Sequence, residues 1–356
     1  MRSGMTQGGI IARMREKSVW RAINLAEGTG SSAGLLGPCP EKAGTLSPAI
    51  TLTHYGGLPL GLLTTLRFVT SHPLNAGHSF QALGRFTRWQ IGSRLLPGSA
   101  VSIPFVNHSR LLITPGMTGA TGNIYTGLHE FEDMGFLLHV LRKDDLFVDI
   151  GANVGSYTVL AGAAIGAHCL TVEPLPVTYD HLLDNIYLNR MQDHVTALNI
   201  GIGREEGTLR FTSSEDTMNH VLAEDETGIP ATEVPVRRLD AIVGDEEPAV
   251  LKIDVEGFET EVIIGGAATL ARPSLLAVIM ELNGSGRRYG YDEAAIHQSM
   301  LGHGFRTFSY RPFTRELIPL DTTNNASGNT LYLKDVEQVA ERIKSAPPVR
   351  SRGIEV

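Results

Sequence analysis

From residue 146 onward, short apolar runs alternate with stretches in which apolar residues recur at helical spacing. The runs are five to eight residues long, which is typical of strands buried on both faces of a sheet. They cover 146–150, 168–173, 195–200, 250–255 and 275–282. Helical patterns lie between most of them, over 156–166, 178–189 and 258–271. This alternation predicts a parallel sheet with helices on both faces and right-handed crossovers.

Two features modify this alternation. Strand patterns over 207–212 and 231–240 precede the fourth sheet strand and bracket a polar loop. After a helical pattern at 292–304, the runs 305–310 and 329–334 are joined by another polar loop, so the last strand is expected to run antiparallel at or near the sheet edge. The prediction is an α/β, Rossmann-like fold with a mostly parallel, seven-stranded sheet.

The chain divides by pattern into four regions. Residues 1–55 are rich in Gly, Ser, Thr and Pro and are predicted to form a flexible lead-in. Residues 56–125 have mixed character, with a helix near 80–96, and are expected to form an accessory region packed on the main domain. That domain is predicted over 126–335, and residues 336–356 are predicted to form one short helix and a disordered tail.

Composition narrows the function classes. With 356 residues and a net charge of -8, the chain has no large positive field, so we expect no nucleic-acid partner. The two cysteines, Cys39 and Cys169, show no metal or disulfide spacing, which fits the cytoplasm. The N-terminus lacks a signal-peptide pattern, and the apolar run 58–69 is too short for a transmembrane segment and is expected to be a buried helix. No oligomeric state is indicated.

The stretch "DIGANVG" follows the first strand and has the composition of a ligand-binding turn. In an open parallel sheet, ligands bind outside the carboxyl ends of the strands. Gly151 and Gly155 permit a tight turn and close approach of the backbone to a ligand. Asp149 ends the strand, and Asn153 stands where a dinucleotide-binding G-x-G-x-x-G turn has its second glycine. This substitution favours S-adenosylmethionine over a nicotinamide cofactor.

The second strand ends in Glu173, another candidate for the same site. Its carboxylate could accept hydrogen bonds from the two hydroxyls of a ribose. Since both S-adenosylmethionine and NAD contain a ribose, Glu173 indicates an adenosine-containing ligand without separating the two.

Four segments together resemble the FkbM family of S-adenosylmethionine-dependent methyltransferases. They are "FVDIGANVGSYTVLA", "TVEPLPVTYDHLLDNIYLN", "VRRLDAIV" and "LKIDVEGFETEVIIGG", and the similarity covers about residues 126–335. The resemblance implies a class I methyltransferase fold with S-adenosylmethionine as cofactor. It places Asp149, Gly151, Asn153 and Gly155 at the methionine end, Glu173 at the ribose, and Gly201 and Ile202 near the adenine. Since an N-P-P-Y motif is absent, the methyl acceptor is expected to be an oxygen.

A hydroxyl acceptor needs a base, and several residues are candidates. Asp254 and Glu256 follow the fourth strand at the same edge as Asp149, although Glu256 could instead charge the first turn of the next helix. His220, in the inserted segment, titrates near neutral pH but could equally be an inert loop residue. Glu281, at the end of the fifth strand, presents the same choice.

Substrate contacts are expected from the loop after the fifth strand. Arg287, Arg288 and Tyr289 could hold a polar or anionic acceptor, or form a solvated basic turn. No residue set has convincing metal-ligand spacing. The sequence therefore predicts an O-methyltransferase for a hydroxyl of a carbohydrate, glycolipid or secondary metabolite. A nicotinamide-dependent oxidoreductase and a non-catalytic cofactor- or glycan-binding scaffold remain as alternatives.

Overall fold

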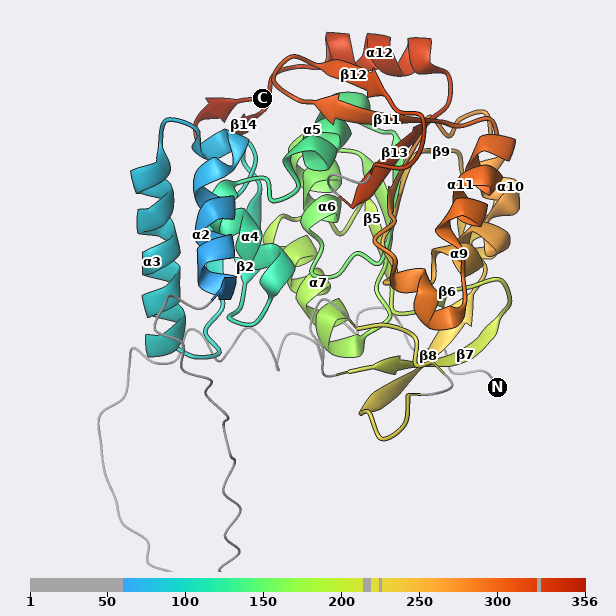
Figure 1. Cartoon of the computed structure of the whole chain (residues 1–356), viewed down its shortest axis with the longest axis horizontal. Helices are drawn as coiled ribbons and strands as arrows, with labels where there is room; N and C mark the ends of the chain where they lie inside the picture. Colours follow the sequence, from blue (N-terminus) through green and yellow to red (C-terminus); the bar gives the residue numbers. More distant parts are fainter. Residues whose placement is uncertain (1–59, 214–218, 224–225, 325–327) are drawn as a thin grey trace, which may run out of the picture. The chain divides into compact units, whose positions relative to one another are not determined.

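The computed structural model describes residues 60–213, 219–223, 226–324 and 328–356 (Figure 1). These residues belong to one compact unit, Gly57–Val356. The predicted lead-in, residues 1–55, lies outside the described residues.

An eight-stranded sheet forms the centre of the fold, in the order β12-β11-β13-β10-β9-β3-β4-β5. Its strands are β3 Leu146–Ile150, β4 His168–Val172, β5 Val195–Leu198, β9 Pro248–Ile253, β10 Ala277–Glu281, β11 Arg306–Arg311, β12 Glu316–Pro319 and β13 Asn329–Leu333. The neighbours from β5 to β10 pair in parallel. In chain order these five strands run 3-2-1-4-5, which is the doubly wound arrangement, with its switch point between β3 and β9. The predicted Rossmann-like architecture is confirmed.

The far edge of the sheet is antiparallel. β13 lies between β10 and β11 and runs antiparallel to both, as expected for a strand near the edge. The sheet contains one strand more than the predicted seven, because the loop after β11 turns back as β12 and pairs with it. β12 has only four residues, none of them buried, so its sequence carried little strand signal.

Helices cover both faces of the sheet (Figure 1). Phe147 and Val250 belong to a core cluster with α5 Phe131–Val140, α6 Ser156–Val159 and α7 Pro176–Leu188. The alternate strand residues Val148 and Leu251 belong to a second cluster on the opposite face. The helices on that face are α8 Leu239–Val243, α9 Glu259–Gly265, α10 Ala267–Leu270 and α11 Glu293–Gly302. A π-helical turn, Leu160–Ile165, continues α6.

The inserted strands form a second, three-stranded sheet in the order β6-β8-β7. Its strands are β6 Gly201–Ile202, β7 Gly207–Thr212 and β8 Ala231–Arg237, so the two inserted strands predicted from the sequence are confirmed. Phe211, Val234 and Val236 pack with Leu175 in a small cluster of their own.

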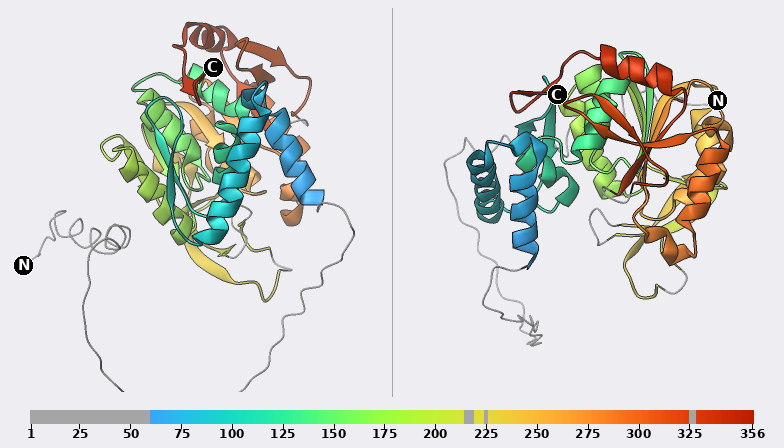
Figure 2. Two further views of the ribbon diagram at one scale, coloured as in Figure 1. Left: turned by 90° about the vertical axis from the view of Figure 1, so that its left-hand side faces the viewer. Right: turned by 45° about the horizontal axis from the view of Figure 1, so that its top comes forward.

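The accessory region shares its core with the main domain. It contains α2 Leu60–Ser71, a 3₁₀ turn at Pro73–Asn75, α3 Ser79–Leu95, β1 Val101–Pro104, β2 Arg110–Ile113 and α4 Thr118–Thr126 (Figure 2). The backbone of β2 bonds to two side chains of α7: Leu112 N–H donates to Asn185 Oδ1 at 2.7 Å, and Arg110 N–H donates to Asn189 Oδ1 at 2.8 Å. The α2 helix is present as predicted but is mostly not buried, and Leu63 is 50% exposed.

The C-terminal tail is ordered, which corrects the expectation of a disordered end. After α12 Val336–Ser345, strands β14 Arg350–Ser351 and β15 Ile354–Glu355 form a hairpin. Its turn residues Arg352 and Gly353 have φ of 55° and 81°, as a tight two-residue hairpin turn requires. Val349 and Val356 are buried, and Ser351 forms a bridge to Val106. The tail is ordered because the accessory region supplies a β-bridge partner, Val106, and an apolar surface.

Among the described helices, none combines the length and the apolar character needed to cross a membrane.

Candidate functional site

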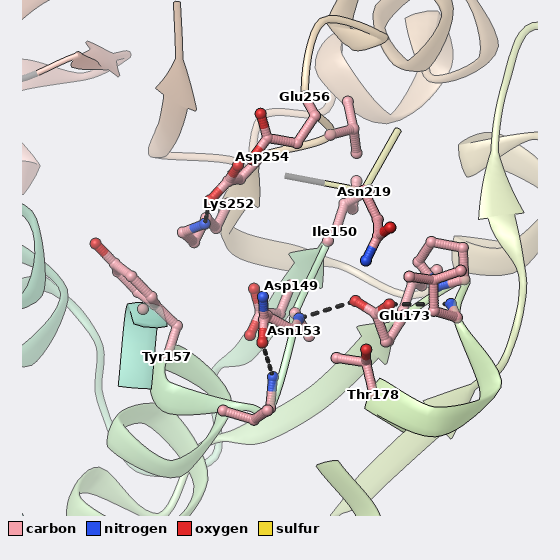
Figure 3. Close-up of a pocket in the computed structure, with 18 of the residues that line it drawn as sticks. Asp149, Ile150, Asn153, Tyr157, Glu173, Thr178, Asn219, Lys252, Asp254 and Glu256 are labelled. Atoms are coloured by element: carbon pink, nitrogen blue, oxygen red, sulfur yellow. Dashed lines mark hydrogen bonds and ion pairs between the residues drawn. The ribbon is translucent and has the colours of Figure 1, made fainter. Parts of the chain in front are cut away.

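A cavity of about 270 Å³ opens at the carboxyl ends of β3, β4, β9 and β10 (Figure 3). It therefore lies at the switch point, where ligands bind in doubly wound sheets. The predicted residues that line it are Asp149, Gly151, Asn153, Glu173, Gly201, Ile202, Asp254 and Glu256. Gly155 begins α6 directly behind this wall.

Gly151 lies where the turn after β3 passes close to the end of β9. Its φ is +78°, and a Cβ there would lie 1.8 Å from the Asp254 carbonyl oxygen. The Gly151 and Ala152 N–H groups both donate to the Val172 carbonyl, at 3.0 and 2.9 Å. The turn is thus held between the two neighbouring strands, and only glycine fits at its tightest point.

Asp149 lies under this turn and is fully buried. Its Oδ2 accepts a hydrogen bond of 2.7 Å from Thr158, whereas no described residue bonds to the buried Oδ1. Burial raises the pKa of Asp149, although Lys252 and the bond from Thr158 oppose this. An acceptor oxygen without a partner beside a cavity is suited to a donor group on a ligand.

Glu173 projects from the end of β4 to the opposite side of the same turn (Figure 3). Its Oε2 accepts from Asn153 N–H and its Oε1 from Leu175 N–H, both at 3.0 Å. Asn153 has φ of 52°, a left-handed conformation that asparagine tolerates and that turns its N–H toward the carboxylate. Burial raises the pKa of Glu173 to about 7 in spite of these bonds. Each carboxylate oxygen retains acceptor capacity for a hydroxyl group.

Lys252 is a buried cation at the other end of the cavity. Its Nζ lies 2.6 Å from Asp254 Oδ2 and 4.8 Å from the centre of the Tyr157 ring. Burial alone would lower the pKa of Lys252, but Asp254, Glu130 and Asp149 together raise it well above its usual range. The lysine therefore stays charged and orients Asp254.

Three carboxylates meet above Lys252, from the ends of β9 and β10. Oxygens of Asp254, Glu256 and Glu281 lie within 4.8 Å of one another. Burial, followed by repulsion from Asp254, raises the pKa of Glu256 to about 7. Burial, then repulsion from Asp254 and Glu256, raises the pKa of Glu281 to about 9. These oxygens could also hold a divalent cation, a possibility that spacing along the chain does not reveal because the ligands come from two strands.

The small sheet forms the remaining wall. Gly201 and Ile202 are both buried in β6, and a Cβ on Gly201 would lie 2.9 Å from Cζ of Phe211, which also lines the cavity. The wall is apolar and close to the backbone, which suits the flat face of a nucleobase.

Other predicted site residues lie beside the cavity instead of lining it. The His220 ring is buried, and its Nε2 lies 3.1 Å from Glu226 Oε1. Arg287, Arg288 and Tyr289 lie on a 3₁₀ turn, Ser285–Tyr289. Tyr289 donates to the Val221 carbonyl at 2.6 Å, and Arg288 Nε lies 3.6 Å from Glu226. This turn holds the inserted segment in place through its arginine and tyrosine.

Sequence patterns alone did not identify Lys252, Tyr157 or Glu130, all of which line the cavity. Lys252 did carry a signal, because a lysine inside an otherwise apolar strand is rarely buried without a partner. Tyr157 and Glu130 carried none, because only the tertiary fold brings them to the strand ends.

The described residues fit S-adenosylmethionine. The turn at Gly151 exposes backbone, Asp149 Oδ1 lacks a partner, and Glu173 offers acceptors for hydroxyls. An apolar wall lies on the adenine side, and carboxylates lie where the reacting groups would meet.

Known methyltransferases are similar in sequence to part of this chain. The hexuronic acid methyltransferase AglP of Haloferax volcanii is 31% identical over 155 residues, covering 41% of this chain and 59% of AglP. The methyltransferase sdnD of Sordaria araneosa is 28% identical over 169 residues, covering 38% of this chain and 65% of sdnD. The chain thus spans less than two thirds of either relative. A solved M. jannaschii TYW2 in complex with AdoMet is 10% identical, covers 67% of this chain and 87% of that one, and has a TM-score of 0.35, too low to support an argument.

The predicted resemblance is confirmed by a family profile described as "Methyltransferase FkbM domain", which matches residues 149–307. The match begins at Asp149, includes most of the residues that line the cavity, and ends in β11. Residues 149–307 of this chain are thus similar to the FkbM methyltransferase domain.

Proposed function

We propose that the protein is an S-adenosylmethionine-dependent O-methyltransferase acting on a hydroxyl of a carbohydrate, glycolipid or secondary metabolite. The observation that carries the proposal is a single cavity with a ribose-type acceptor, Glu173, at one end and three carboxylates around Lys252 at the other. When bound, S-adenosylmethionine supplies an electrophilic methyl group on a sulfonium. The named activity of AglP on a hexuronic acid supports an oxygen-rich acceptor. We place the enzyme in the cytoplasm, in line with its few cysteines.

We assign the base to Glu256. It lines the cavity, and a pKa of about 7 matches the range in which a carboxylate removes a hydroxyl proton most effectively at neutral pH. Glu256 would take the proton of the acceptor hydroxyl as its oxygen receives the methyl group that bound S-adenosylmethionine would supply, which would give a methyl ether and S-adenosylhomocysteine.

The neighbouring groups position the acceptor. Glu281, with a pKa of about 9, keeps its proton at neutral pH and can donate a hydrogen bond to the acceptor. Asp254 is oriented by Lys252 and can accept one. Correct alignment of the two reacting atoms can itself lower the barrier by about 7 to 11 kcal/mol in favourable cases.

Binding calorimetry tests the cofactor half of the proposal. Wild-type protein should bind S-adenosylhomocysteine, and Glu173→Ala should weaken binding by roughly 10-fold or more, because two hydroxyl contacts are lost. Glu205→Ala, an exposed glutamate outside the cavity, serves as the matched control and should bind as wild type does. If wild type binds neither S-adenosylmethionine nor S-adenosylhomocysteine, the proposal fails.

Transfer of a labelled methyl group tests the catalytic half. Hexuronic acids and neutral glycosides form the first acceptor panel. Glu256→Gln should lower turnover by about 100-fold or more while S-adenosylhomocysteine affinity stays near the wild-type value. Cofactor binding without methyl release to any acceptor would instead indicate a non-catalytic scaffold.

A further inference from the structure

The outer face of α3 is apolar although nothing in the described structure covers it. Phe80, Gly84, Arg88, Ile91 and Leu95 follow one another at intervals of three or four residues, so they lie on one side of the helix. Phe80 is 91% exposed, Ile91 54% and Leu95 73%. The opposite side of α3 is turned inward and buries Ala82 and Phe86. Since the inner side already supplies the core contact, the outer stripe has no role in the described fold.

The stripe continues past the end of the helix. Leu96 is 64% exposed and Val101, the first residue of β1, is 43% exposed. Both line a groove of about 290 Å³ together with Trp89 and Ile124. Half of the most exposed large apolar side chains of the described residues lie in this part of the chain: Leu63, Phe80, Ile91, Leu95, Leu96 and Val101. Such a concentration marks an interaction surface.

The charge of this region is opposite to that of the rest of the chain. No Asp or Glu occurs from residue 42 to residue 129, although the whole chain has a net charge of -8. Arg67, Arg85, Arg88, Arg94 and Arg110 lie within this interval. All except Arg85, which bonds to Asn75 and the Tyr125 carbonyl, are exposed. On α3 itself, Arg88 lies within the stripe and Arg94 lies next to Leu95.

We propose that the α3 face, defined as Phe80, Arg88, Ile91, Arg94, Leu95 and Leu96, docks on an anionic phospholipid bilayer (Figure 2, left). Apolar side chains next to arginines, without carboxylates, are typical of helices that lie in a membrane interface. The apolar groups enter the boundary between headgroups and acyl chains, and the arginines meet the lipid phosphates.

Charge and composition disfavour other occupants. In a two-fold dimer through α3, this face would meet the same face of the other copy, so Arg88 and Arg94 would find no acidic residue from 42 to 129 to pair with. A nucleic acid would satisfy the arginines but would leave Phe80, Ile91 and Leu95 uncovered.

Vesicle flotation of the full chain tests the proposal. Wild-type protein should float with vesicles of phosphatidylcholine mixed with phosphatidylglycerol, but not with phosphatidylcholine alone, and salt should release it. Ile91→Ser with Leu95→Ser, and separately Arg88→Gln with Arg94→Gln, should each weaken binding by about 10-fold or more. Val177→Ser with Ile264→Ser removes equally exposed apolar groups elsewhere, 71% and 45% exposed, and should leave binding unchanged.

Three results would overturn the proposal. Wild type could fail to bind anionic vesicles, the α3 variants could bind as wild type does, or binding could persist on neutral vesicles. A fourth result that would overturn it comes from sedimentation velocity of the same variants. If wild type is an oligomer and Ile91→Ser with Leu95→Ser dissociates it, the α3 face joins copies of the chain instead of binding a membrane. Every readout here is binding to vesicles or to another copy of the chain. A failure of this proposal can therefore be told apart from a failure of the proposed methyl transfer.

Discussion

Lys252 acts electrostatically on the carboxyl groups around it at one end of the cavity. It opposes the rise of the pKa in each of three carboxyl groups, Asp149, Glu256 and Glu281. Removing either the lysine or its carboxylate partner would destabilise the fold, because the buried charge that remains would have no counter-charge. Its place next to the proposed base, in a strand with no exposed residues, indicates a positioning role.

Replacing Lys252 should therefore change the pH dependence of the reaction. In Lys252→Met the positive charge that lowers these pKa values is lost, so the pKa of Glu256 should rise above about 7. A base must be deprotonated, so the acidic limb of kcat/KM against pH should move to higher pH. Turnover at pH 7 should fall by roughly 10- to 100-fold.

Two measurements separate this role from a structural one. S-adenosylhomocysteine affinity should stay within about 3-fold, since Lys252 is remote from the ribose end, and Lys252→Arg should recover part of the wild-type pH profile. If the acidic limb of kcat/KM against pH is unchanged in Lys252→Met, Lys252 does not have this positioning role.

Among single residues, the sequence predicted those that lie in the turn after β3 or directly at the end of a strand. Asp149, Gly151, Asn153 and Glu173 follow a motif, and each lines the cavity. Residues whose place depends on crossing elements were missed or displaced. Tyr157 reaches the cavity from α6, whereas His220 is turned toward Glu226 by an inserted segment that local pattern does not orient.

The turn between β3 and α6 is the element on which the site depends. It begins at Gly151, which is held against the carbonyl of Asp254, the residue after β9, and ends at Gly155, where a Cβ would lie 2.5 Å from Leu182 Cδ1. Its shape thus depends on β9 and α7 as well as on its own residues.

Gly151→Ala should destabilise both the fold and the site. The new Cβ would overlap the Asp254 carbonyl, and φ of +78° is strained for alanine, so the free energy of unfolding should fall by about 3 kcal/mol or more. Denaturant unfolding measures this, and calorimetry should show loss of S-adenosylhomocysteine binding.

Gly304→Ala is the matched control. Its φ is +88°, but a Cβ there has open space, so only backbone strain of roughly 1 kcal/mol is expected, with cofactor binding retained. Equal losses in the two variants would show that close contact at Gly151 is unimportant.

Elements with strong apolar runs were predictable, because burial on both faces leaves little ambiguity. β9, whose six residues are all buried, is the clearest case. Short strands at the periphery were not. β12 has no buried residue to mark it, and the β14–β15 hairpin depends on Val106, which lies far away in the chain.

On the scale of the molecule, one apolar core joins regions that the sequence suggested as separate. Val69, Val106, Phe147, Leu331 and Val356 all belong to it. The accessory region and the C-terminal hairpin therefore share the core of the main domain and contribute to its stability.

Removing residues 347–356 should destabilise the whole unit. Buried Val349 and Val356 would be lost, as would the bonds from Arg352 to the Asn123 and Ile124 carbonyls. The Tm should fall by roughly 4 °C or more in a thermal scan. Arg350→Ala with Glu355→Ala removes only an exposed ion pair of 3.7 Å and should leave Tm within about 1 °C. A truncated protein as stable as wild type would show that the hairpin is dispensable.

The bridge between Ser351 and Val106 also sets an order of events during synthesis. The hairpin is synthesised long after Val106, so the surface around Val106 stays uncovered until Ser351 has left the ribosome. The accessory region can reach its final packing only after that point, and a nascent chain stalled before Ser351 should be a target for chaperones that bind exposed apolar surface.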